Sequence, residues 1–136
     1  DSRISFLGQL PRNKVIEWQK KATVLVNPRQ NNEEFTKYSF PSKTMEYLSS
    51  GIPVVAYKLD GIPDEYDQYI QYVADDSIES LKKKLVEVCE MTREERQELG
   101  NIGRNFVLTR KNSTIQVRKI CEMIGFVLRG REVNDR

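Results

Sequence analysis

The chain has 136 residues, which is enough for one domain built around a single hydrophobic core. Hydrophobic residues make up 38% of the chain and charged residues 31%, a composition that argues against a disordered or membrane-spanning protein. The net charge is +2 and there is no histidine, so the composition also argues against a nucleic-acid binder, a zinc site and a histidine general base.

Segments typical of strands alternate with segments typical of helices in the first half of the chain. Val24, Leu25 and Val26 are apolar at consecutive positions, a pattern that favours a strand buried on both faces of a parallel sheet. The helix expected at residues 41–50 ends at Gly51, which suits the left-handed residue that closes a helix. The remaining elements expected here are strands at residues 4–7, 23–26 and 53–56, a third or edge strand at 70–73, and a short helix from Pro11 or Asn13 through Trp18.

The last third of the chain has a helical pattern. Asp76 and Thr92 each stand three residues before a glutamate, which is the spacing of a capping box, and a final helix is expected from about Ser113. Cys89 and Cys121 fall in these helices, and we expect buried thiols there rather than a disulfide. The strand–helix alternation predicts an α/β fold with a Rossmann-like parallel sheet flanked by helices. Apolar residues recur at helical spacing behind the three helix starts: Ile78, Leu81, Leu85 and Val88; Leu99, Ile102 and Phe106; Val117, Ile120, Cys121, Ile124 and Val127.

The predicted sheet is short of strands. Three or four can be found, whereas sheets of this class usually have about five or six. The chain also opens directly on a strand, so we expect residues 1–136 to be a partial domain of a longer protein. Residues 1–4 lack the charged-then-apolar layout of a signal peptide, which favours a cytoplasmic protein.

The longest loop leads from the strand at residues 23–26 into the helix at residues 41–50. Parallel sheets bind ligands at the carboxyl ends of their strands, and loops longer than about 12 residues are often functional. The helix start offers free N–H groups that suit a phosphate, and Glu46, one turn further on, suits the hydroxyls of a sugar. Arg29 and Lys43 are the local basic residues suited to a diphosphate. The alternatives are that the loop is only a solvated excursion, that Arg29 and Lys43 are surface cations, and that Glu46 merely stabilises the helix start.

Residues 40–55 carry the pattern Glu-x-x-x-x-Gly-x-Pro-Val-Val. This segment resembles the donor-binding motif of retaining GT-B glycosyltransferases that build bacterial capsular and lipopolysaccharide sugars, the glycosyl transferases group 1. Other segments resemble that family in the same order, so the similarity covers nearly the whole chain. These segments are residues 4–8, with Phe-Leu-Gly; 24–28, a strand followed by proline; 60–65, similar to a Gly-Gly-x-x-Glu loop; and 94–107, with Leu99, Gly100 and Arg104.

The resemblance implies the truncated C-terminal half of a GT-B fold, which binds a nucleotide-diphosphate sugar for transfer of a hexose to a growing polysaccharide or lipid-linked glycan. It implies that Glu46 binds the ribose, that the preceding helix start holds the diphosphate, and that no metal or cofactor is needed. The family has a glutamate eight positions before Glu46, where this chain has Tyr38; Glu33 or Glu34 could substitute for it if the loop folds back. The expected substrate-binding residues are Arg29, Tyr38, Phe40, Pro41, Ser42, Lys43 and Glu46.

Three functions remain open: a transferase domain, a GT-B sugar-nucleotide epimerase, and a non-catalytic α/β interaction module. The expected partners are the nucleotide sugar and an N-terminal acceptor domain of the parent chain, without nucleic acid; this fragment alone is expected to be inactive, and no catalytic residue is assigned. The lysines at 82–84 are interpreted as a solvated helix face, with peripheral contact to the inner face of the cell membrane as the alternative. Tyr57 and Tyr66 are interpreted as ordinary rim aromatics rather than stacking platforms.

Overall fold

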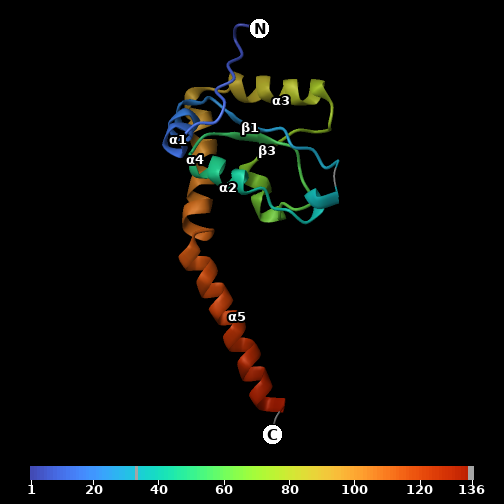
Figure 1. Ribbon diagram of the computed structural model, residues 1–136, viewed down its shortest axis with the longest axis vertical. Coiled ribbons are helices and arrows are strands. Elements are labelled where there is room, and N and C mark those ends of the chain that lie inside the picture. The colour runs from blue at the N-terminus through green and yellow to red at the C-terminus, as the bar shows by residue number, and fades with distance from the viewer. Residues whose placement is uncertain (33, 135–136) are drawn as a thin grey trace.

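The computed structural model describes residues 1–32 and 34–134, with side chains as far as Arg129. Within these residues three strands form a parallel sheet in the order β1 (Leu25–Asn27), β2 (Val54–Ala56) and β3 (Gln71–Tyr72) (Figure 1). The predicted α/β fold with a parallel sheet flanked by helices is confirmed. The helices are α1 (Arg12–Lys21), the 3-10 helix η1 (Glu34–Lys37), α2 (Ser42–Ser49), the 3-10 helix η2 (Asp64–Tyr69), α3 (Ile78–Glu90), α4 (Arg93–Arg110) and α5 (Ser113–Asn134).

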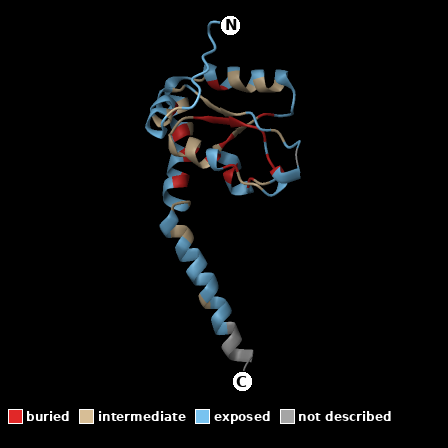
Figure 2. Ribbon diagram, viewed as in Figure 1, coloured by how far each residue is buried: buried red, intermediate tan, exposed pale blue. Residues whose placement is uncertain are grey.

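The central strand β2 is buried on both faces (Figure 2). Successive side chains of a strand point to opposite faces, so Val54 and Ala56 enter one apolar cluster and Val55 enters another. The first cluster joins the sheet to α2 and α4, and the second joins it to α3. Besides β2, the first contains Leu48, Leu59, Ile62, Tyr66, Ile70, Phe106 and Val107, and the second contains Tyr57, Val73 and Val88.

Helix α4 packs against α2 through glycines. Gly51 ends α2 with φ +77°, the left-handed conformation predicted for it, and its carbonyl group lies against Gly100 of α4. A Cβ atom at Gly100 would lie 1.9 Å from that carbonyl oxygen, and a Cβ atom at Gly103 would lie 2.8 Å from Leu48 Cδ2. The two helices therefore approach so closely that neither glycine of α4 leaves room for a side chain.

The starts of α3 and α4 are capped by side chains. The predicted capping box of α4 is confirmed, because Thr92 Oγ1 accepts from the Glu95 backbone N–H at 3.2 Å and Glu95 Oε2 accepts from the Thr92 N–H at 2.7 Å. The predicted capping box that starts at Asp76 is wrong. Ser77 is the N-cap of α3, and its hydroxyl accepts from the Ser80 N–H at 3.1 Å.

Several predicted apolar contacts are absent. Residues 4–7 do not form a strand: Phe6 is 95% exposed, and within the described part of the chain no strand pairs with this segment. Ile78, the first residue of α3, and Ile102 of α4 are both exposed. Cys89 and Cys121 are free thiols, as predicted, but both are exposed rather than buried.

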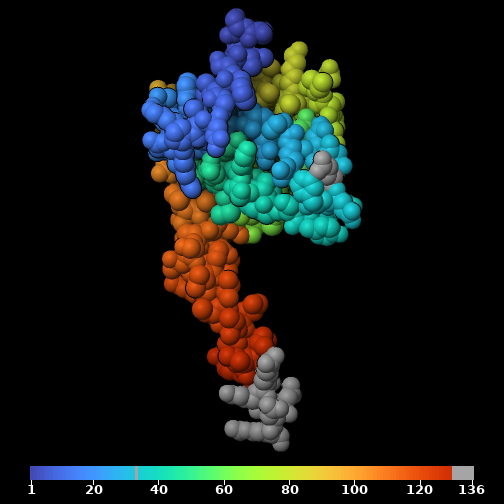
Figure 3. All heavy atoms as spheres, in the orientation of Figure 1, coloured from blue at the N-terminus to red at the C-terminus, as the bar shows by residue number. Residues whose placement is uncertain are grey.

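Helix α5 projects away from the body of the domain (Figure 3). Its predicted apolar face is present but covered by nothing in the described structure, and the side chains remain about half exposed or more. Among the described residues no helix is both long and apolar enough to cross a membrane. The exposed apolar residues of α5 are Val117, Ile120, Met123, Ile124, Phe126, Val127 and Leu128.

The first prediction concerns the contact between α2 and α4. Gly100→Ala should lower the free energy of unfolding by about 1–3 kcal/mol or more, because the new methyl group overlaps the Gly51 carbonyl. Urea unfolding followed by circular dichroism measures this change. Gly125→Ala on α5 is the matched control, since nothing lies within 4 Å of its added carbon; it should be neutral or stabilise by up to about 1 kcal/mol. Equal stability of Gly100→Ala and the unmodified chain would contradict the close approach.

The second prediction concerns Thr44, which faces the sheet and is completely buried. Its hydroxyl has no hydrogen-bond partner among the described residues. Thr44→Val keeps the shape and removes the unpaired hydroxyl, so it should raise the free energy of unfolding by about 1 kcal/mol. Thermal denaturation provides the measurement. Thr44→Ser, which keeps the hydroxyl and loses the methyl, should be destabilising instead; a destabilised valine variant would show that the hydroxyl is paired.

Candidate nucleotide-sugar site

A hollow of about 240 Å³ opens where β1 ends and α2 begins. Its wall combines the carboxyl end of β1 with the last residues of the loop that enters α2. Among the expected site residues, the structure brings five together here: Arg29, Phe40, Pro41, Ser42 and Lys43. Asn27 and Ser39 complete the lining, and neither was predicted from the sequence. The position of Asn27 as the last residue of β1 is the signal that could have identified it.

The start of α2 faces this hollow without a side-chain cap. Pro41 is the N-cap residue, in an extended conformation, and it has no side chain that accepts from the first turn. The first turn also contains no acidic residue, so no carboxylate neutralises the partial positive charge of the helix start. Lys43 adds a full positive charge beside it. The arrangement therefore favours an anion such as a phosphate group.

The loop in front of α2 is fastened to the loop that follows β2. Asn31 Nδ2 donates to Asp60 Oδ1 at 2.6 Å, and Asn31 Oδ1 accepts from the Thr36 hydroxyl at 2.9 Å. Gly61 lies directly under this loop, because a Cβ atom there would stand 2.6 Å from the Ser39 carbonyl oxygen. The Asp60–Gly61 pair that resembled a family loop thus supports the backbone that enters α2.

Arg29 stands between two adjacent hollows. Its guanidinium group lies 5.4 Å from the centre of the Phe35 ring, within the range of a cation–π interaction. The second hollow, of about 460 Å³, shares Asn27 and Arg29 with the first and is lined otherwise by residues of the loop after β1 and of η1. Together the two hollows give a polar surface with Arg29 at their junction. The further lining residues of the second hollow are Pro28, Gln30, Asn32, Phe35 and Thr36.

Glu46 lies on α2 outside both hollows and faces α1. Its Oε1 atom accepts a hydrogen bond of 2.5 Å from Nε2 of Gln19, a buried residue of α1. Burial, and then the neighbouring charge of Glu46, raises the pKa of Tyr47. Oε2 of Glu46 receives no hydrogen bond from the described residues, so one oxygen of an oriented carboxylate is free for a ligand.

Other expected residues are placed apart from the hollows. Tyr38 is 83% exposed and lines neither of them, and Glu34 is exposed on η1. Glu33 lies outside the described residues. Tyr57 and Tyr66 are not rim aromatics, since both are buried in the apolar clusters, where Tyr66 packs on Phe40 with ring centres 5.0 Å apart. That contact fixes Phe40 at the edge of the first hollow.

A family model described as glycosyl transferases group 1 matches residues 2–106. The matched segment includes all three strands, the two hollows and α2, and ends within α4. Neither curated proteins nor solved structures provide a match. Since the family model covers more than half of the chain, the protein belongs to the glycosyl transferases group 1 family.

Proposed function

We propose that this chain is the donor-binding domain of a retaining GT-B glycosyltransferase, and that it holds the diphosphate of a nucleotide sugar at the start of α2. The observation that carries the proposal is the hollow formed by Arg29, Lys43 and the uncapped helix start. The family match supports glycosyl transfer as the reaction, and nucleotide sugars are its proposed donors.

The proposed chemistry depends on charge that develops on the donor. Transfer breaks the bond between the anomeric carbon and a diphosphate oxygen, and the departing nucleoside diphosphate keeps the bonding electrons. The acceptor hydroxyl oxygen forms the new bond to the anomeric carbon, and its proton passes to the departing diphosphate. Cations and helix N–H groups already aimed at the departing diphosphate oxygen stabilise its new charge without reorganisation. In this chain those groups are Arg29, Lys43 and the first turn of α2. Their role in catalysis is electrostatic and positional.

Glu46 is the proposed partner of the ribose. The hydrogen bond from Gln19 orients its carboxylate, and the free oxygen is available to accept from a ribose hydroxyl. Because Glu46 lies one helical turn beyond Ser42, a diphosphate in the hollow would extend its nucleoside along α2 toward α1. Tyr38 is not part of this arrangement, so the donor sugar would contact the loop hollow around Arg29 instead.

Acceptor recognition is proposed to come from an N-terminal domain that packs on α5. This helix exposes a row of apolar side chains, and large exposed apolar surfaces mark interaction sites. Transfer to a growing bacterial polysaccharide or lipid-linked glycan in the cytoplasm is part of the same proposal. Lys84 pairs with Glu87 at 2.8 Å, which leaves Lys82 and Lys83 as the exposed lysines of that run for a membrane contact.

The third prediction is that nucleoside diphosphates bind at the start of α2. UDP, GDP and ADP are titrated separately while backbone amide shifts are recorded, and at least one should perturb residues 39–46 at millimolar concentration. Arg29→Gln should weaken that binding about tenfold, the loss typical of one charged hydrogen bond. A nucleotide that perturbs only residues far from α2 would contradict the proposed site. Saturable binding to an unrelated surface would favour the interaction module.

The fourth prediction isolates Glu46. Glu46→Gln keeps the side-chain volume and replaces a charged acceptor with a neutral one, so nucleoside diphosphate affinity should fall by about one order of magnitude. The melting temperature should change little, because Glu46 is only partly buried. Lys82→Ala, on the exposed face of α3, is the control and should alter neither quantity. If the affinity of the Glu46 variant equals that of the control, Glu46 does not bind the ribose.

A further inference from the structure

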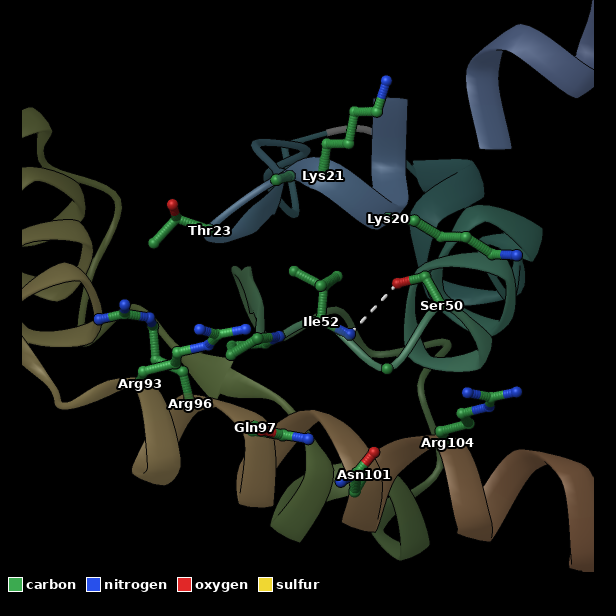
Figure 4. A pocket seen from close by; sticks show the side chains of 13 residues that line it. Lys20, Lys21, Thr23, Ser50, Ile52, Arg93, Arg96, Gln97, Asn101 and Arg104 are labelled. Carbon is green, nitrogen blue, oxygen red and sulfur yellow. Dashed lines mark hydrogen bonds between the residues drawn. The ribbon is translucent and has the colours of Figure 1, made fainter. Parts of the chain in front are cut away.

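A second cleft lies at the amino-terminal ends of the strands, opposite the nucleotide-sugar site at their carboxyl ends. It has a volume of about 450 Å³ and forms where β1 and β2 begin, between the end of α1, the turn from α2 to β2, and the first half of α4 (Figure 4). Leu25, the first residue of β1, pairs with Val54, the first residue of β2, so both strands begin beside this cleft. The cleft is therefore separated from the hollow beyond Asn27 by the length of the strands.

Basic side chains surround this cleft. Lys20 and Lys21 come from the last turn of α1, and Arg93, Arg96 and Arg104 come from α4, whereas no carboxylate lines it. Figure 4 shows the lysines on one side of Ile52 and the arginines on the other. The whole chain carries a net charge of +2, so this concentration of cations is a local feature and not a reflection of composition.

The charges of the cleft are largely uncompensated. Among the described residues Lys20, Arg93 and Arg104 make no ion pair. Lys21 pairs with Glu17 at 2.9 Å, but both side chains are exposed and such pairs are weak. Arg96 donates to the carbonyl groups of Cys89 and Met91, which fixes its position without neutralising its charge.

Arg93 lies at a position where its charge is unfavourable for the stability of helix α4. It is the first residue of α4, where the helix dipole is positive and a cation is destabilising. A bound anion would offset this repulsion. The turn from α2 to β2 at this cleft is already ordered, since the Ser50 hydroxyl donates to the Tyr47 carbonyl at 2.6 Å and accepts from the Ile52 N–H at 3.3 Å.

We propose that this cleft binds a compact phosphate-bearing ligand, distinct from the donor nucleotide. Its concave shape and the surplus of cations along its wall suit a phosphate or diphosphate group, and Gln97 and Asn101 add neutral polar groups to the wall. The same chemistry occurs in soluble phosphorylated molecules and in the head groups of acidic phospholipids. The proposal is independent of the function assigned to the hollow at α2.

The test uses the 136-residue chain, with inorganic pyrophosphate as the soluble ligand and vesicles of equimolar phosphatidylcholine and phosphatidylglycerol as the lipid. Amide shifts are recorded without added nucleotide, and the residues of the cleft are followed separately from residues 39–46 at the first site. Pyrophosphate should perturb residues 20–23, 50–53 and 93–104. Cosedimentation with the acidic vesicles, but not with vesicles of phosphatidylcholine alone, would assign the ligand to a lipid head group.

The double variant Lys20→Gln/Arg93→Gln should weaken binding of the active probe at least about tenfold. Its melting temperature should be unchanged or higher, because Arg93 is unfavourable at the helix start. Arg118→Gln/Lys119→Gln removes the same charge from exposed α5 positions and should leave binding unchanged. Failure of both probes to bind at these residues, an equal loss in the control, or tighter binding of a DNA oligonucleotide than of either probe would overturn the proposal.

Discussion

The contact between Gly51 and Gly100 sets the geometry on which both candidate sites depend. It brings the backbone of α4 against the turn from α2 to β2, with no space for a side chain between them. This approach places Leu48 of α2 and Phe106 of α4 in one apolar cluster with β2. Since helices and packed cores are not continuously deformable, the direction of α2 is fixed at its carboxyl end. The start of α2 is consequently held at the carboxyl end of β1.

Each end of α2 lies beside a different basic surface. At its start, Pro41 leaves the first N–H groups without a side-chain cap, and Arg29 and Lys43 add charge beside them. At its end, the same glycine turn forms the floor of the basic cleft, between cations of α1 and α4. A single short helix thus separates two surfaces that both favour anions. This spacing permits a donor nucleotide and a second phosphate-bearing molecule to be bound at once.

The sequence predicted the elements that are determined by interactions between residues close together in the chain. The apolar run of Val54 and Val55 is a buried parallel strand, Gly51 is the left-handed residue after α2, and Thr92 and Glu95 form the capping box. These features depend on neighbours within a few residues. Five of the seven expected site residues meet at one hollow because a strand end and the following helix start are necessarily adjacent. The resemblance to glycosyl transferases added the family, which the residue pattern alone left open.

Features that depend on tertiary contacts were not predictable in the same way. Cys89 and Ile78 match an apolar helical pattern, yet both are exposed, Ile78 at the first residue of α3. The bond from Gln19 to Glu46 joins residues 27 positions apart, and no local pattern indicates it. The basic cleft likewise assembles residues from α1, the α2–β2 turn and α4, which no sequence window contains together.

The central claim is that the start of α2 holds the donor diphosphate. A crystal structure of the chain with a bound nucleoside diphosphate tests it most directly. We expect diphosphate oxygens within hydrogen-bond distance of the backbone N–H groups of Ser42 and Lys43, and near the guanidinium group of Arg29. We also expect the ribose beside Glu46. A diphosphate bound instead in the basic cleft at the end of α2, with the hollow at the start of α2 empty, would contradict the assignment of the donor site.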